Sequence, residues 1–330
     1  MLVRARSGSI GTVAEQAAAR GPDDLAAPVR RLLPRIGGIG VIERLSALSG
    51  SDFTSVMLEV ARRRAARESA ASVLRRYRDS RFVRPGTTPW PALRRAEDLL
   101  LGSLPSDVDV LTLAPVVPLG THSVLGTVSQ DRVVTAVRAC EVAADPTNAL
   151  ALEAAERRAE AGGGAAGTVR LAAVQRVVRA QRPGSAGFFA HFSLFGLVTA
   201  GRDEGGQRFE CSAVAEQVTV AVSALAAAGL RGTQVAFTPL SDAGRRVAES
   251  VAGVLASLPA EIVEDPHRRA GRGYYRDLCF KINVRADGEL VELGDGGFTD
   301  WTQQLTANNK ERLLISGIGV DRLAALIDSS

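Results

Sequence analysis

Two arginines provide the strongest chemical signal in the sequence. Arg179 lies in a β-branched run that predicts a strand, and Arg322 follows Gly317 and Gly319 at the start of a predicted helix. A guanidinium group matches phosphate oxygens in shape and charge. Glycines before such an arginine let a ligand approach the backbone closely. This pattern predicts a site for phosphate groups.

Other chemistries lack support in the residue spacing. Serine, histidine and aspartate occur without any pattern that predicts a catalytic triad. The three cysteines, Cys140, Cys211 and Cys279, stand far apart and show no zinc or disulfide spacing. No stretch approaches the roughly 20 uninterrupted apolar residues that span a bilayer. We therefore expect a cytoplasmic protein with reduced thiols and no membrane partner.

The run Arg-Val-Val-Arg-Ala-Gln-Arg-Pro (176–183), followed by a turn and Phe-Ala-His-Phe-Ser-Leu-Phe-Gly (189–196), resembles motif 2 of class II aminoacyl-tRNA synthetases. The similarity is to the form found in histidyl-tRNA synthetase. The later run Ser-Gly-Ile-Gly-Val-Asp-Arg-Leu (316–323) is similar to motif 3. Between them, Tyr-Tyr (274–275) and Gly-Gly-Phe-Thr-Asp (296–300) resemble further family elements in the right order.

The resemblance covers about residues 95–328 and implies an α+β fold. Its catalytic core would be an antiparallel sheet of six or seven strands flanked by helices, usually in a homodimer. ATP and Mg²⁺ are the implied cofactors. Arg179 would hold the α-phosphate, and Arg322 would hold the γ-phosphate and stack on adenine. Gln181, Gly317 and Gly319 complete the implied nucleotide site.

The resemblance also implies a substrate site and a metal site. The substrate-binding positions match Thr147, Leu194, Tyr274, Tyr275 and, after a shift in alignment, Arg272. Carboxylates that could hold magnesium are Glu289, Glu292 and Asp295. The reaction implied is the attack of a carboxylate on the α-phosphate, helped by electrostatic stabilisation of phosphoryl charge.

The chain departs from histidyl-tRNA synthetase where that enzyme binds the α-ammonium group of histidine. The matching positions here are Thr147, Leu194 and Val198, which offer no carboxylate. A buried ammonium group without a counter-charge costs several kcal/mol. The additional catalytic arginine of the family matches Ala270. The sequence also lacks a match to the anticodon-binding domain, so we do not expect it to charge tRNA with histidine.

The elements that must position these residues follow from hydrophobic periodicity and from turn residues. The fold class predicted from them is α+β with an antiparallel sheet, because several strands form hairpins with helices between them. We predict strands over 108–113, 133–142, 169–181, 188–200, 234–239, 277–284, 290–293 and 313–318, and a strand–turn–strand over 120–128. We predict a glycine-rich turn at 294–297 and helices over 91–101, 148–161, 212–228, 242–258, 300–307 and 320–327.

Residues 1–88 are predicted to form a basic helical extension before a core at 89–330. The whole chain of 330 residues has a net charge of +4. Its first 90 residues hold 16 arginines against eight acids. We expect helices over 23–33 and from Ser51 to about Tyr77, the second with arginines along one face from Arg62 to Arg78.

Three functions remain open at this stage. The favoured one is an ATP-dependent ligase that activates a small carboxylate as an adenylate. The second is a non-catalytic subunit similar to the regulatory subunit of ATP phosphoribosyltransferase, with a partner enzyme. The third is an RNA-binding protein that uses the helix from Arg62 to Arg78, although no aromatic residues alternate with its arginines.

Overall fold

The computed structural model describes residues 25–161, 167–180, 190–269, 271 and 273–329. Its contacts divide the chain into two units, one of residues 1–70 with 137–139 and the other of 71–136 with 140–330. The smaller unit takes only part of the predicted extension at 1–88, and the core beginning at residue 89 stays a prediction.

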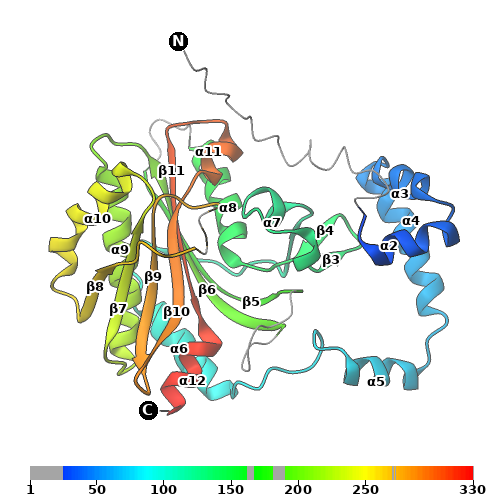
Figure 1. Ribbon diagram of the computed structural model, residues 1–330, viewed down its shortest axis with the longest axis horizontal. Coiled ribbons are helices and arrows are strands. Elements are labelled where there is room, and N and C mark those ends of the chain that lie inside the picture. The colour runs from blue at the N-terminus through cyan, green and yellow to red at the C-terminus, as the bar shows by residue number, and fades with distance from the viewer. Residues whose placement is uncertain (1–24, 162–166, 181–189, 270, 272, 330) are drawn as a thin grey trace, which may run out of the picture. The chain divides into compact units, whose positions relative to one another are not determined.

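A large sheet forms the centre of the larger unit (Figure 1). Within the described residues it has eight strands, in the order β1-β5-β6-β11-β10-β9-β7-β8. Pairing is antiparallel from β5 through β7 and parallel at the two edges. The predicted antiparallel sheet is therefore confirmed, with an added parallel strand at each edge. The strands are β1 (Asp109–Val110), β5 (Val169–Val178), β6 (His191–Arg202), β7 (Thr233–Pro239), β8 (Ala260–Glu264), β9 (Arg276–Ala286), β10 (Glu289–Thr299) and β11 (Glu311–Gly319).

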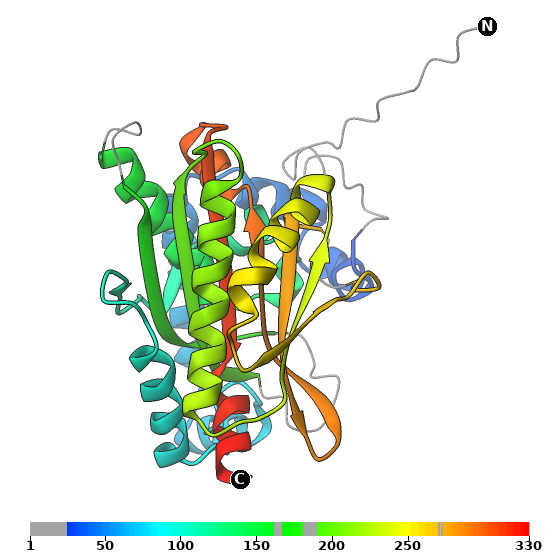
Figure 2. The same ribbon diagram turned by 90° about the vertical axis from the view of Figure 1, so that its left-hand side faces the viewer.

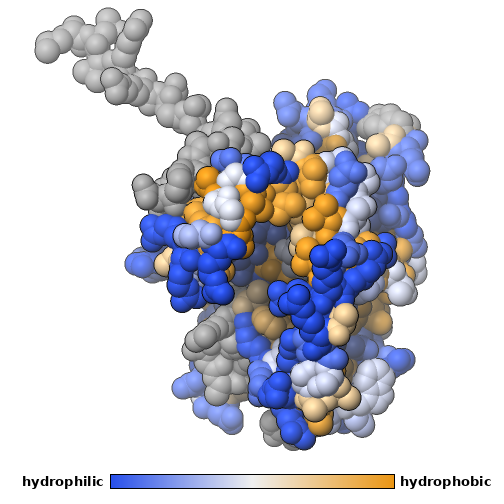
Figure 3. Space-filling model, turned by 90° about the vertical axis from the view of Figure 1, so that its right-hand side faces the viewer, coloured by the Kyte–Doolittle hydropathy of each residue, from blue (hydrophilic) through white to orange (hydrophobic). Residues whose placement is uncertain are grey.

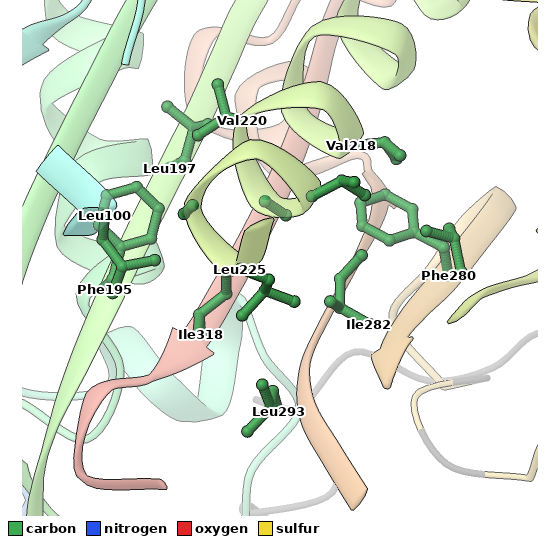
Figure 4. Packing of buried hydrophobic residues seen from close by; sticks show 14 of the residues in the cluster. Leu100, Phe195, Leu197, Val218, Val220, Leu225, Phe280, Ile282, Leu293 and Ile318 are labelled. Atoms are coloured by element: carbon green, nitrogen blue, oxygen red, sulfur yellow. The ribbon is translucent and has the colours of Figure 1, made fainter. Parts of the chain in front are cut away.

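One face of the sheet is covered by α9 (Arg208–Ala227) and α10 (Asp242–Leu255), which lie next to each other in Figure 2. Two further helices, α6 (Trp90–Gly102) and α12 (Val320–Ser329), pack together on the same core. By length and composition α9 resembles a membrane span, but most of it is buried here, as expected of a core helix. Figure 4 shows the packing between α9 and the strands, including Phe195, Leu197, Val218, Leu225, Phe280 and Ile282.

The opposite face of the sheet carries α8 (Pro146–Glu160) and α11 (Trp301–Thr306), as Figure 1 shows. Asp145 caps the first turn of α8, because its carboxylate accepts the backbone N–H of Thr147 at 3.0 Å. Farther along, Arg158 of α8 makes a two-pronged ion pair with Glu311 of β11, at 2.7 and 2.9 Å, and both side chains are buried. This pair ties α8 to the sheet.

A smaller sheet, in the order β2-β4-β3, precedes α8. The structure around this sheet differs from the strand–turn–strand predicted over 120–128 and from the single strand predicted over 133–142. The carboxylate of the buried Glu141 accepts the backbone N–H groups of Gly120 and His122, at 3.1 and 2.8 Å. The chain therefore folds around this carboxylate as a short helical turn. The elements are β2 (Val116–Pro118), α7 (Thr121–Val124), η3 (Gln130–Arg132), β3 (Thr135–Ala136) and β4 (Cys140–Val142).

The turn predicted at 294–297 is wrong, because those residues lie within strand β10. A Cβ atom on Gly294 would lie 2.1 Å from the carbonyl oxygen of Gly317 on β11. Glycine at this position therefore permits close approach of two strands, and it does not mark a turn. The predicted strand over 108–113 is also shortened, to the two residues of β1.

The described residues before α6 form short helices, but no residue between 25 and 70 is buried. Two helices, α4 and α5, replace the single helix predicted from Ser51 to about Tyr77, with Ser69 directly before α5. The arginines from Arg62 to Arg78 therefore do not share one helix face. In Figure 3, hydrophilic and hydrophobic residues lie side by side on the surface. The elements are α2 (Ala27–Leu32), η2 (Leu33–Arg35), α3 (Ile39–Ser46), α4 (Gly50–Ala65) and α5 (Ala70–Asp79).

Candidate functional site

A cavity of about 400 Å³ lies within the larger unit, at the beginning of α8 and α12 and beside the β5–β6 hairpin. The structure brings most of the predicted site residues together in its lining. These are Arg179, Arg322, Gly317, Gly319, Thr147, Leu194, Tyr274, Tyr275, Glu292 and Asp295. Glu289 is not part of the lining, and Gln181 and Arg272 lie outside the described residues.

Arg179 directly follows strand β5, and its side chain lines the cavity. Its backbone N–H donates to the carbonyl of Ala190 at 2.8 Å, which continues the pairing of the hairpin. Its Nε donates to the carbonyl of Ala144 at 3.0 Å, and one Nη lies 3.3 Å from the carboxylate of Asp145. The guanidinium also lies over the ring of Phe192, 5.1 Å from its centre. These contacts fix the orientation of a half-buried cation.

Arg322 enters the cavity from the first turn of α12. Its Nη1 donates to the carbonyl of Glu292 at 2.7 Å, which links α12 to strand β10. The two nearby glycines form part of the cavity wall. A Cβ atom on Gly317 would lie 3.4 Å from the carbonyl oxygen of Phe195, and one on Gly319 would lie 3.5 Å from that of Leu293. Protein packing therefore does not require glycine there, whereas a ligand that approaches the backbone would.

The aromatic wall of the cavity consists of Tyr274, Tyr275 and Trp301. The rings of Tyr274 and Trp301 are stacked with centres 6.1 Å apart, and those of the two tyrosines lie 4.3 Å apart. Burial raises the pKa of both tyrosines, and the nearby carboxylate of Asp295 raises the pKa values further. Both hydroxyl groups therefore stay protonated at neutral pH.

The buried Arg268 was missed by the sequence analysis. It donates to the carboxylate of Asp295 at 2.6 Å and to the carbonyl of Phe280 at 2.8 Å. Burial raises the pKa of Asp295, and Arg268 opposes this shift. Arg268 follows a Pro-His pair in a run of arginines, and that context does not distinguish it from a surface residue.

His122 and Asn148 were also missed. The backbone N–H of Ala144 donates to His122 Nε2 at 3.0 Å, so the ring proton lies on Nδ1. His122 Nδ1 therefore donates to Asn148 Oδ1, 2.7 Å away. This bond orients the Asn148 amide. In sequence, His122 is one of three scattered histidines, and only the position of Asn148 beside Thr147 could have indicated it.

Three positions match the ammonium-binding groups of histidyl-tRNA synthetase. Two of them, Leu194 and Val198, are apolar, and the hydroxyl of the third, Thr147, is already hydrogen-bonded within the protein. The hydroxyl of Thr147 donates to Asp145 at 2.7 Å as part of the helix cap. Leu194 lines the cavity, and Val198 is buried in the core. None of these three side chains provides a carboxylate to the cavity.

The candidate magnesium ligands Glu289, Glu292 and Asp295 do not form one cluster in the structure, and their role stays a prediction. Glu289 and Glu292 lie on opposite faces of β10, because Glu292 pairs with Asn283 and Glu289 with Ala286 in the strand register. Glu292 forms an ion pair with Lys281 at 3.0 Å, and Asp295 forms one with Arg268. Among the described residues, no group of three or more ligand side chains could hold a metal ion.

Comparisons with known proteins identify the fold. No family model matches the chain, and no curated protein matches it in sequence. Solved structures do match. An ATP phosphoribosyltransferase regulatory subunit/histidyl-tRNA synthetase from Bacillus halodurans C is 14% identical, with a TM-score of 0.58 over 75% of this chain and 82% of its own.

Two further structures agree with this result. A histidine–tRNA ligase subunit from Alicyclobacillus acidocaldarius is 13% identical, with a TM-score of 0.56 over 75% of this chain and 96% of its own. Apo histidyl-tRNA synthetase from S. aureus is 16% identical, with a TM-score of 0.55 over 72% of this chain and 65% of its own. The chain therefore has the fold of the class II aminoacyl-tRNA synthetase core, in the form seen in histidyl-tRNA synthetase.

Proposed function

We propose that the protein binds ATP in this cavity and activates a small carboxylate as an adenylate. The observation that carries the proposal is that Arg179 and Arg322, which are far apart in sequence, line one cavity beside Gly317 and Gly319. A Cβ atom at either glycine would meet its neighbours only at ordinary contact distance, so the glycines leave the backbone without a side chain where a phosphate chain would approach. Fixed guanidinium groups are suited to stabilise charge that develops on phosphate oxygens.

In the proposed reaction, a carboxylate oxygen attacks the α-phosphorus of ATP. A new oxygen–phosphorus bond forms, the bond to the β-phosphate oxygen breaks, and pyrophosphate leaves with its electrons. Arg179 orients the α-phosphate, and Arg322 neutralises the leaving phosphates. We assign no step to a protein-bound magnesium ion. The carboxylates of Asp145, Asp295 and Glu292 pair with arginine or lysine, and that of Asp321 accepts from Thr88 and Ser193.

The proposed substrate is not histidine. Thr147, Leu194 and Val198 offer no counter-charge for an α-ammonium group, and the hydroxyl of Thr147 is already bonded to Asp145. Burying an unpaired ammonium there would cost several kcal/mol. The acid to be activated therefore differs from an α-amino acid at this position.

Calorimetric titration with MgATP tests the proposal. Wild-type protein should release heat, whereas Arg179→Ala and Arg322→Ala should each weaken binding by at least about tenfold, because a charge-assisted bond contributes about 1.5–3 kcal/mol. Arg245→Ala is the matched control, since Arg245 is exposed on α10 and pairs with Glu264 outside the cavity. Exchange of radiolabelled pyrophosphate into ATP over a panel of acids then identifies the substrate. Absence of ATP heat together with absence of exchange across the panel contradicts the proposal.

A non-catalytic regulatory subunit is the second candidate. The observation that favours it is the ion pair of Arg179 with Asp145, which occupies part of the guanidinium that catalysis would need. The Bacillus halodurans structure, described as an ATP phosphoribosyltransferase regulatory subunit/histidyl-tRNA synthetase, has a similar fold. This candidate predicts that a partner enzyme co-purifies with the protein and changes activity when the protein is removed. Light scattering would test the homodimer that both candidates include.

A further inference from the structure

Two residues that line the cavity carry buried N–H donors without hydrogen-bond partners among the described residues. The donors are Asn148 Nδ2 and Trp301 Nε1, and their residues are only 3% and 2% exposed. A buried donor without an acceptor costs about 1–3 kcal/mol. Two such donors on one cavity therefore indicate a ligand that brings acceptors.

The direction of the Asn148 amide is fixed by the protein. Because Ala144 N–H occupies His122 Nε2, His122 must donate from Nδ1, and only the oxygen of Asn148 can accept that bond. The Nδ2 group is therefore the one left for a ligand. Gly126, which also lines the cavity, lies beside this group, since a Cβ atom there would be 3.8 Å from Nδ2.

The second donor sits at the edge of an aromatic wall. Trp301 packs against α8 through the cluster that includes Leu150 and Ala151, and its ring is stacked with that of Tyr274. Stacked rings at a cavity wall favour a flat group. An indole N–H lies in the plane of its ring, so it bonds an acceptor at the ring edge.

The nearby charges are already paired within the protein. Asp295 is bonded to Arg268, and Asp145 to Arg179. Neither an ammonium nor a carboxylate group entering this part of the cavity would find an unpaired counter-charge among these four residues. A neutral group with acceptors avoids both desolvation penalties.

We propose that the part of the cavity between Asn148 and Trp301 binds a neutral, planar group that carries hydrogen-bond acceptors, such as a carboxamide on an aromatic ring. This inference rests on the proposed function, because the group would belong to the acid that is activated. The inference specifies the chemical class of the side chain of that acid. The cavity of about 400 Å³ has room for such a ring beside a nucleotide phosphate.

The chain allows a direct test because it contains only two tryptophans. Trp90 is 68% exposed on α6 and is not part of the cavity lining, so Trp90→Phe leaves Trp301 as the only indole. In this variant the single indole N–H resonance of a ¹⁵N-labelled sample reports on Trp301 Nε1. The probes are nicotinamide, nicotinate and 3-(aminomethyl)pyridine, which share one ring and differ in the charge of its substituent.

Nicotinamide should shift the indole resonance in a saturable way and bind at least about tenfold more tightly than nicotinate or 3-(aminomethyl)pyridine. Asn148→Asp keeps the acceptor for His122 and replaces the orphan donor by an acceptor. It should reverse the order, so that 3-(aminomethyl)pyridine binds best. An indole resonance that nicotinamide does not move, or that the charged probes move as strongly, overturns the proposal.

The test separates this inference from the proposed function. ATP calorimetry on the same Trp90→Phe protein shows whether the nucleotide site exists. If ATP releases heat but nicotinamide does not shift the indole resonance, only the proposed subsite is contradicted. If nicotinamide shifts the resonance but ATP releases no heat, only the proposed nucleotide site is contradicted. The thermal midpoint of Asn148→Asp provides the folding control, and unchanged preference in a folded variant counts against the proposal.

Discussion

At the residue scale, Asp295 connects the chemistry of the cavity to pH. Burial raises its pKa above the ordinary value of 3.8, with Arg268 acting in the opposite direction. The folded carboxyl group therefore holds its proton more tightly than the unfolded one. Its contribution to the free energy of unfolding decreases as pH rises from about 4 through the raised pKa, and is constant above it.

Asp295→Asn should reveal this dependence. The variant keeps an oxygen that accepts from Arg268 but cannot ionise, so it should gain stability relative to the wild type as pH rises from about 4.5 to about 7. Thermal unfolding of both proteins across that range is the measurement. A wild-type advantage that grows with pH would mean that Arg268 outweighs burial and lowers the pKa of Asp295.

At the element scale, the buried pair Arg158–Glu311 fixes α8 against β11, and so fixes the residues that α8 brings to the cavity. Glu311→Gln should lower the free energy of unfolding by about 3–5 kcal/mol, because it leaves a buried guanidinium without its counter-charge. The exposed pair Arg245–Glu264 is the matched control, and Glu264→Gln should cost less than about 1 kcal/mol.

Chemical denaturation measures both values. The double variant Arg158→Met with Glu311→Leu should recover much of the loss, because apolar replacement of a buried pair removes both charges. Equal, small costs for Glu311→Gln and Glu264→Gln would show that the buried pair does not hold α8 in place.

The elements also show how far the sequence can predict this fold. Apolar periodicity located β6, β7, α9 and α10 because those segments pack through regular faces. It failed at Gly294, where the reason for glycine is the carbonyl of Gly317, a residue on another strand. It failed again over 120–128, where the structure depends on the buried carboxylate of Glu141.

The candidate site shows the same limit. Arg179, Arg322 and the tyrosine pair were predicted as site residues because their positions match motifs of a known family. Arg268, His122 and Asn148 were not found, since their importance comes from partners that are distant in sequence or from burial. Local sequence carries no signal of either property.

At the scale of the whole molecule, the two hydrophobic clusters lie entirely after residue 90. Residues 25–70 contribute no buried side chain. A protein of residues 71–330 should therefore unfold cooperatively, with a thermal midpoint within about 4 °C of the full chain, which corresponds to about 1 kcal/mol or less. Differential scanning calorimetry of the two proteins measures this. Loss of the cooperative transition would show that the first 70 residues stabilise the core.

The fixed amide of Asn148 has a consequence for how this fold could change its ligand over time. Codons for asparagine and aspartate differ in one base, so a single point mutation would turn the outward donor into an acceptor. The inward bond from His122 would survive that change, because both side chains offer it an oxygen. A cavity built in this way could switch between neutral and cationic ligands in one mutational step without rebuilding the helix beneath it.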